Sequence, residues 1–152
     1  MRAKEYLMQL CKLDVKITQK IDELSQLHSM LQGKAVSYDG VHVQTSPQNM
    51  QEKVICRCID MEADINEMID HYICQKDRII NEIHELGDPR YIQILYMHYV
   101  PDERHQVKRL EDIAVIMKKP NGDSYDYMYI NRLHGEALRE FDRKILGNDI
   151  EK

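Results

Sequence analysis

Three arginines in the C-terminal part of the chain have the spacing that places side chains on one face of a helix. Arg139 and Arg143 follow Arg132 by 7 and 11 residues, which is close to two and three helical turns. The planar guanidinium group of arginine donates paired hydrogen bonds to guanine edges and to phosphate groups. The spacing therefore indicates a contact with nucleic acid, and the alternative is a solvated face balanced by neighbouring acidic residues.

The segment that carries these arginines, residues 126–146, is predicted to be an amphipathic helix. Its other face is mainly apolar and is expected to be buried. That face consists of Ile130, Leu133, His134, Ala137, Leu138, Phe141 and Ile145. Because that face would pack against the rest of the protein, the cationic face is left for a ligand. The residues expected to contact DNA lie on or beside the cationic face and in the turn before the helix. They are Lys118, Lys119, Tyr125, Met128, Tyr129, Asn131, Arg132, Gly135, Arg139 and Arg143.

The expected contacts differ along the helix. Arg132, near its N-terminal end, suits contact with bases, whereas Arg139 and Arg143 suit the phosphate backbone. Gly135 lies at the centre of the cationic face. A glycine costs a helix about 1 kcal/mol, which suggests that close approach of a backbone is the reason for it.

The cysteines show no pattern of a metal site or a disulfide framework. They are Cys11, Cys56, Cys58 and Cys74. On a helix, Cys56 and Cys58 fall on different faces, which suits neither a zinc knuckle nor a bond between them. His71 and Cys74 form an i, i+3 pair, but no second pair matches it. We therefore expect four free thiols and no metal.

Other reactive side chains do not indicate an enzyme. Asp60, Asp64 and Glu67 share a helix face, and such clusters are mostly hydrated surface. The sequence contains no glycine-rich phosphate loop and no arrangement of nucleophile, histidine and carboxylate. We expect a protein without catalytic activity and without a cofactor.

The charge of the chain is unevenly distributed. The formal net charge of −5 argues mildly against nucleic-acid binding by bulk attraction. Residues 1–86 contain 10 Lys and Arg against 14 Asp and Glu, whereas residues 87–152 contain 11 against 12. No stretch approaches the roughly 18 apolar residues of a membrane span, and the N-terminus lacks the apolar core of a signal peptide. We expect a cytoplasmic protein that does not contact a membrane.

Two long helices are predicted in the first part of the chain, over residues 3–32 and 47–86. Their apolar positions recur close to every seven residues, as in a coiled coil. The loop between them, residues 33–46, contains Asp39-Gly40, a tight-turn signal, so a small β-hairpin and an irregular loop are both open. We expect residues 1–86 to form an antiparallel helical hairpin, and the alternative is pairing with a second chain through the same stripes.

Three further helices are predicted in residues 87–152. Asp88-Pro89 begins the first, which extends to about Tyr99. A short helix follows over 110–117, and the turn 118–124 contains Pro120 and Asn121-Gly122. Together with the helix at 126–146, this is the plan of a helix-turn-helix domain. The predicted fold class is all-α.

Residues 89–141 resemble region 4, the promoter-reading part, of bacterial sigma factors. Tyr91–Tyr99 is similar to the first helix of that region, Leu110–Met117 to its second helix, and Arg132–Leu138 to its recognition helix. The whole chain is similar to small sigma-like regulators encoded by phages and prophages. The turn Lys118–Tyr125 is longer than the usual sigma turn. The resemblance implies a DNA-binding transcription regulator that acts with host RNA polymerase in an activator or accessory role.

Two other functions remain open from the sequence. A DNA-packaging protein, such as a terminase small subunit, also joins a helix-turn-helix to an oligomerising helical arm. A coiled-coil interaction protein without DNA binding would use the two long helices alone. The expected partners are double-stranded DNA, RNA polymerase and a second copy of the chain through the helical arm.

Overall fold

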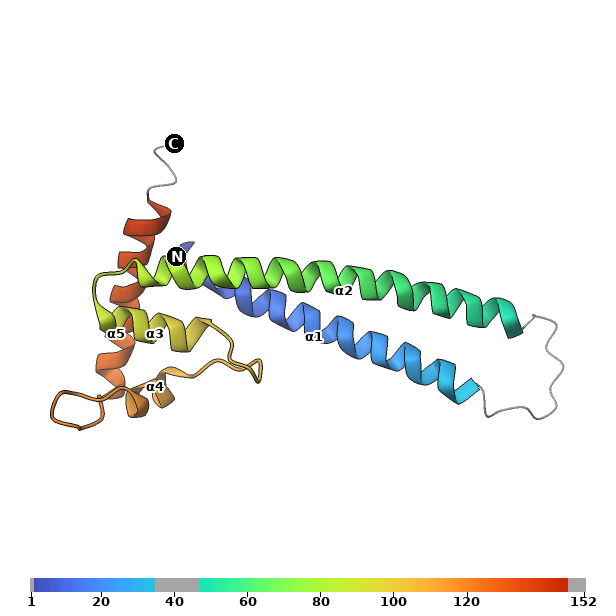
Figure 1. Cartoon of the computed structure of the whole chain (residues 1–152). Coiled ribbons are helices and arrows are strands. Elements are labelled where there is room, and N and C mark those ends of the chain that lie inside the picture. Colours follow the sequence, from blue (N-terminus) through green and yellow to red (C-terminus); the bar gives the residue numbers. More distant parts are fainter. Residues whose placement is uncertain (1, 35–46, 148–152) are drawn as a thin grey trace. The chain divides into compact units, whose positions relative to one another are not determined.

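The protein is all-helical, as the sequence predicts. The computed structural model describes residues 2–34 and 47–147, and within these ranges every named element is a helix (Figure 1). The helices are α1 (Arg2–Lys34), α2 (Pro47–His84), α3 (Pro89–Tyr99), α4 (Leu110–Ile116) and α5 (Tyr127–Phe141), and α5 continues as a π-helical turn, η1 (Asp142–Leu146). The expectation of a β-hairpin or loop around Asp39-Gly40 lies outside the described residues.

The helix ends follow from local chemistry. Pro89 occupies the first turn of α3, and the Asp88 carboxylate caps it by accepting a hydrogen bond from the Arg90 backbone N–H at 2.9 Å. The second helix ends at His84 rather than Leu86, because Glu85 and Leu86 already form the turn that leads into Gly87. The other bounds differ from the predicted ones by a few residues at most, apart from the π-helical continuation of α5.

The chain divides into two compact units, and one of them consists of two segments that are not consecutive in the sequence. Residues Met1–Asp14 and Tyr72–Lys152 form one unit, here called the core unit. Residues Val15–His71 form the other, here called the arm. The boundary at residue 87 that the sequence suggests falls inside the core unit.

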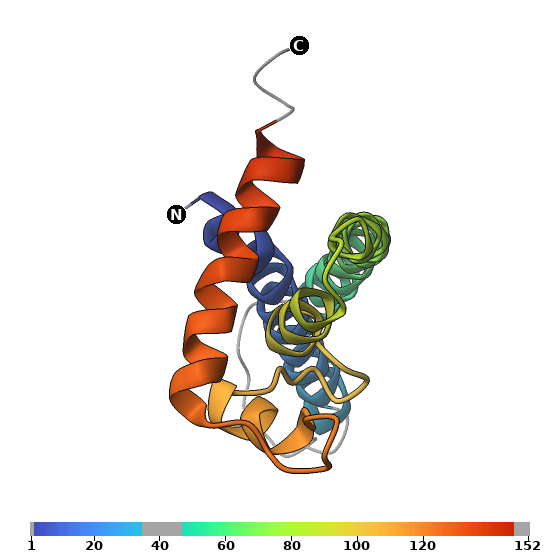
Figure 2. The same ribbon diagram turned by 90° about the vertical axis from the view of Figure 1, so that its left-hand side faces the viewer.

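The core unit is built around one apolar cluster to which all five helices contribute. Fully buried side chains come from the start of α1, the end of α2 and all three shorter helices; they include Leu7, Leu10, Ile79, Ile83, Ile94, Leu95, Ile113, Ile130 and Phe141. Within this unit α5 crosses α3 at a steep angle (Figures 1 and 2). This crossing fixes which side of α5 is buried.

Polar contacts hold the segment after α3 against the first helix of the core unit. The Asp14 carboxylate is 5% exposed and lies 2.8 Å from the His105 Nδ1 atom. His105 has a positive φ of 61°, a left-handed conformation that costs energy for a residue other than glycine. The Cys11 thiol donates to the Tyr99 carbonyl at 3.3 Å. The contact with Asp14 holds His105 in this backbone conformation.

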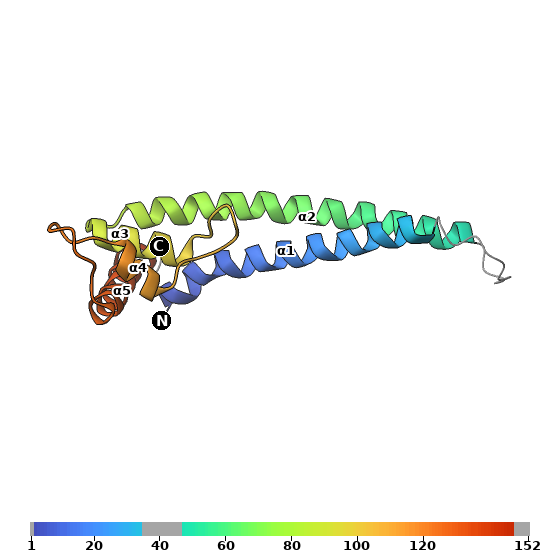
Figure 3. The ribbon, with the colours of Figure 1, turned by 90° about the horizontal axis from the view of Figure 1, so that it is seen from below.

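The arm contains the remaining parts of the two long helices. Within it the segments of α1 and α2 lie side by side and run in opposite directions (Figures 1 and 3), and His28 lies 3.4 Å from Glu62 across the pair. The buried hydrophobic residues described in the arm are Ile17, Cys58, Met61 and Ile65. In the described residues, no helix is both long enough and apolar enough to span a membrane.

Candidate nucleic-acid interface

The two faces of α5 differ as the sequence predicts. Five of its apolar residues are buried in the core unit: Ile130, Leu133, Ala137, Leu138 and Phe141. On the other side Met128 is 70% exposed, and Asn131, Arg132 and Arg139 are also exposed. Because the apolar face is already covered by the protein, the outer face of α5 is the one available for a ligand.

Four side chains from the turn and from α5 form a ladder of cations and aromatic rings. The Tyr125 and Tyr129 rings stack with their centroids 5.0 Å apart and their planes 10° apart. The Lys119 Nζ atom lies 5.9 Å from the Tyr125 centroid, and the Arg132 Cζ atom lies 5.5 Å from the Tyr129 centroid. Each cation gains from the negative face of a ring, so the ladder fixes the turn to the helix.

The turn between α4 and α5 is ordered by its own hydrogen bonds and extends away from the helices (Figure 1). Gly122 has a φ of +87°, which explains the glycine. The Asn121 side chain bonds both the backbone N–H and the carboxylate of Asp123, at 3.1 and 3.0 Å. Lys118 pairs with Ser124 through a backbone bridge and a 2.9 Å side-chain contact. The turn therefore presents Lys118 and Lys119 from a defined backbone.

A hollow of about 460 Å³ lies beside the ladder and is lined by Met128, Tyr129, Asn131 and Arg132. These residues all belong to the first two turns of α5, where the sequence places the base-contacting residues. Arg132 also lies 3.7 Å from Glu136, an exposed i, i+4 pair of small energetic weight. The hollow combines one apolar side chain with an amide and a guanidinium group, a suitable set for base edges.

The structure separates Arg139 and Arg143 from this cluster. Arg139 is exposed about two turns further along α5, about 10 Å from Arg132 by helical rise. Arg143 lies in η1, and its guanidinium group contacts the Glu140 carboxylate at 2.6 Å. That carboxylate lowers the positive potential around Arg143, because the pair is charge-neutral. Hydrogen bonding to Arg143 lowers the pKa of Glu140, so the carboxylate stays ionised.

No packing inside the protein requires a glycine at position 135. A Cβ atom built there meets no atom within 4 Å. The glycine has an ordinary helical backbone, so its conformational freedom does not explain it either. The close approach of a ligand backbone, which the sequence suggests for this glycine, stays a prediction.

Arg90 belongs to the same cluster, although the sequence gives no signal for it. Its Nη1 atom donates to the Tyr129 hydroxyl at 2.6 Å, across 39 residues of chain. Its Nε and Nη2 atoms contact the Asp88 carboxylate at 3.2 and 2.7 Å. The hydrogen bond from Arg90 lowers the pKa of Asp88, and the Asp88 carboxylate raises the pKa of Arg90. The pair is therefore ionised throughout the neutral range.

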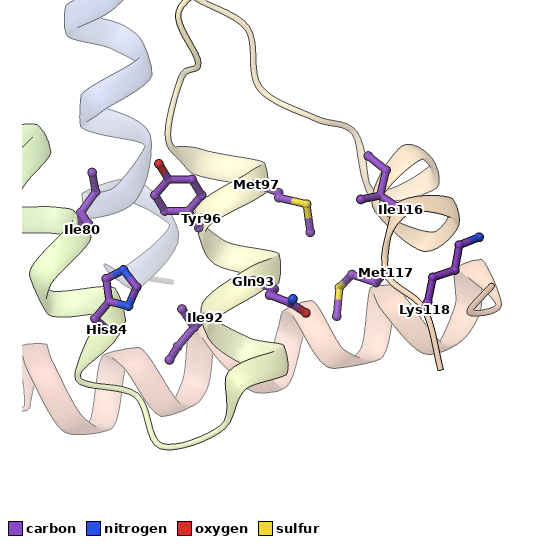
Figure 4. A pocket seen from close by; sticks show the side chains of 9 residues that line it. All are labelled: Ile80, His84, Ile92, Gln93, Tyr96, Met97, Ile116, Met117 and Lys118. Carbon is purple, nitrogen blue, oxygen red and sulfur yellow. The ribbon is translucent and has the colours of Figure 1, made fainter. Parts of the chain in front are cut away.

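A second hollow lies in the core unit where the end of α2 meets α3 and α4 (Figure 4). Its volume is about 660 Å³, and its lining is mainly apolar: Ile80, Ile92, Tyr96, Met97, Ile116 and Met117, with His84, Gln93 and Lys118 also present. Of these residues, Tyr96 on α3 and Ile116 on α4 are exposed, at 42% and 48%. This surface is mainly apolar, whereas the ladder carries two positive charges.

The described residues contain no cluster of three or more side chains that would hold a metal ion. The four cysteines are free thiols. Comparisons with protein-family models, with curated proteins and with solved structures found no match to this chain.

Proposed function

We propose that the protein is a DNA-binding transcription regulator of phage type, with α4, the turn and α5 acting as a helix-turn-helix. The single observation that carries the proposal is the ladder of Lys119, Tyr125, Tyr129 and Arg132 on the exposed side of α5. In this proposal α5 enters the major groove with its N-terminal turns, and Arg132 contacts a base edge.

The ladder favours duplex over single-stranded nucleic acid. Proteins that bind single strands stack bases on aromatic side chains. Here the two tyrosine rings stack on each other, and each ring already contacts a cation of the protein. What the cluster offers to a ligand is therefore hydrogen-bond donors and positive charge rather than open rings, which suits phosphates and base edges of a duplex.

The proposed setting is the cytoplasm, and the proposed protein partner is RNA polymerase, as the sequence resemblance implies. The hollow lined by Tyr96, Met97 and Ile116 gives the core unit an apolar surface that shares no residue with the ladder, and methionines adapt well to protein partners. A pure interaction protein would have the apolar surface but no use for the cationic one.

The test begins with wild-type protein and sequencing of the genomic fragments that it retains. Arg132→Ala is then titrated against the selected duplex and a scrambled one. Loss of a bidentate base contact is expected to cost about 1–3 kcal/mol of discrimination. Arg143→Ala is expected to weaken binding to both duplexes alike and by less, because Glu140 already neutralises that guanidinium group.

Arg57→Ala is the matched control, because Arg57 is an exposed arginine on the arm. It is expected to leave both affinities unchanged. Full discrimination by Arg132→Ala with an intact fold would rule out α5 as the reading element. Absence of duplex binding by the wild type at low salt would reject DNA binding altogether and favour an interaction protein.

A further inference from the structure

Tyr129 joins three segments of the core unit at one side chain. Its hydroxyl accepts a hydrogen bond from Arg90 at the start of α3, and its ring lies against Arg132 of α5. Tyr125 of the preceding turn stacks on the same ring. A single residue therefore contacts two arginines that are 42 positions apart in the sequence, Arg90 and Arg132.

Arg90 is held in place before any ligand arrives. The Asp88 carboxylate contacts its Nε and Nη2 atoms, and the Tyr129 hydroxyl contacts its Nη1 atom. Asp88 is itself fixed, because it caps α3. A side chain with this many contacts has already lost much of its rotamer freedom, so a ligand that binds it loses less entropy.

The guanidinium group of Arg90 can donate further hydrogen bonds. A guanidinium group carries five N–H donors, and one on each of its three nitrogens is engaged here. One donor therefore remains on each terminal nitrogen, and a phosphate oxygen accepts hydrogen bonds from such donors. The Arg90 side chain is 48% exposed, so solvent and ligands reach it.

The two arginines are close enough to contact one duplex together. Arg90 lies at the hydroxyl end of Tyr129 at 2.6 Å, and Arg132 lies 5.5 Å from its ring centroid. The distance between the two guanidinium groups is therefore about the length of one tyrosine side chain. That separation is smaller than the width of the major groove, about 12 Å. A duplex bound at α5 therefore passes within reach of the start of α3.

We infer that Arg90 is a DNA-contacting residue that binds the phosphate backbone, and that Tyr129 is the positioning residue that sets Arg90 beside Arg132. The inference rests on the proposed function and deepens it. The interface then has two kinds of contact at one tyrosine: a base contact from Arg132 and a phosphate contact from Arg90. The phosphate contact fixes the register in which Arg132 meets its base.

The experiment compares Tyr129→Phe, Arg90→Ala and the double variant on the selected and scrambled duplexes. Tyr129→Phe keeps the ring, and with it the contacts to Tyr125 and Arg132, but removes the acceptor for Arg90. It is expected to weaken both affinities about 3- to 10-fold at unchanged melting temperature, with the ratio between the duplexes preserved. Arg90→Ala is expected to weaken both by at least as much. Because Asp88 balances the charge of Arg90, the slope of log affinity against log salt is expected to change by less than one contact.

The double variant separates positioning from two independent contacts. If Tyr129 acts through Arg90, Arg90→Ala with Tyr129→Phe binds no more weakly than Arg90→Ala alone. The matched control is Arg78→Ala, which removes an exposed arginine that is paired with Glu82 on α2. This control is expected to bind as the wild type does.

The outcomes distinguish this inference from the function on which it rests. A wild-type protein that binds no duplex rejects both. A wild type that binds and discriminates, beside Arg90→Ala and Tyr129→Phe variants of unchanged affinity, rejects the inference alone. Losses that add in the double variant show two independent contacts and reject the positioning role of Tyr129.

Discussion

The core unit and the arm each contain part of α1 and part of α2, yet the apolar side chains of these helices are buried to very different extents in the two units. In the core unit α1 and α2 are covered by three further helices, and side chains such as Leu10 and Ile79 are fully buried. Among the described residues of the arm, each helix is covered by the other one alone, and Ile21, Ile55 and Ile59 are exposed. The difference shows that heptad spacing alone does not produce a core, since a helix pair buries one stripe on each member.

The two regions also differ in charge. The arm, residues 15–71, has 5 Lys and Arg against 9 Asp and Glu. The cationic ladder lies in the core unit, on the outer side of α5. The net charge of the chain is therefore a poor guide to its surface, because the arm supplies most of the excess of acidic residues.

The largest expected effect tests the comparison directly, through one large apolar residue from each region. Phe141→Ala removes a fully buried ring from the core unit and is expected to cost about 3–5 kcal/mol of unfolding free energy. Leu24→Ala removes a half-buried side chain from the arm and is expected to cost roughly 1 kcal/mol, because water already reaches part of it. Urea denaturation followed by circular dichroism measures both. Equal losses would remove the distinction between the two regions.

A smaller effect concerns pH and a histidine of the core unit. Burial lowers the pKa of His134 to about 4, with smaller contributions from His98 and Lys4, and its Nε2 atom lies 2.8 Å from the Tyr99 hydroxyl. An unfolded histidine titrates near 6.5. Between these values the unfolded chain binds the proton and the folded chain does not, so stability is full above about pH 6.5 and falls as the pH drops toward 4. Because His134 is partly exposed, the expected loss is discounted to about 1–2 kcal/mol.

The histidine experiment compares unfolding free energies at pH 7 and pH 4.5 for the wild type and for His134→Gln. The difference between the two pH values is expected to be smaller in His134→Gln. His28→Gln is the matched control, because His28 is an exposed histidine of the arm beside Glu62. A wild type and a His134→Gln variant with the same pH dependence would show that His134 does not titrate in this way.

The smallest expected effect is a difference in thiol reactivity. Cys58 of the arm is buried, whereas Cys11 of the core unit is half-buried. Burial and the nearby Asp14 carboxylate raise the pKa of the Cys11 thiol, and only the thiolate reacts. A helix pair with few buried side chains unfolds locally more often than a unit in which five helices share one apolar cluster. Alkylation followed by mass spectrometry is therefore expected to modify Cys58 before Cys11, although Cys58 is the less accessible of the two. The opposite order would place the more stable region in the arm.

Features that depend on neighbours in the sequence could be predicted from it. The start of α3 follows from Asp88-Pro89, and the buried face of α5 follows from a 3.6-residue period that ends in Phe141. Ionic and aromatic contacts that depend on the path of a turn or on the crossing of two helices could not. The ring stack of Tyr125 on Tyr129 depends on the path of a turn, and the Arg90 contact to Tyr129 depends on how α3 crosses α5. Periodicity reports which face of a helix is apolar but not which other helix covers it.

The start of α1 belongs to the core unit, and this has a consequence for how the protein is made. The rings of Tyr6 and Phe141 lie 6.0 Å apart, although nearly the whole chain separates them. Residues 2–14 leave the ribosome long before α5 is synthesised. Until α5 has emerged, their apolar side chains lack the contacts with α5 that bury them. Contacts of such high sequence separation slow folding, because the entropy of closing the long loop is lost before burial compensates for it. The nascent chain is therefore expected to complete this core only after α5 has left the ribosome.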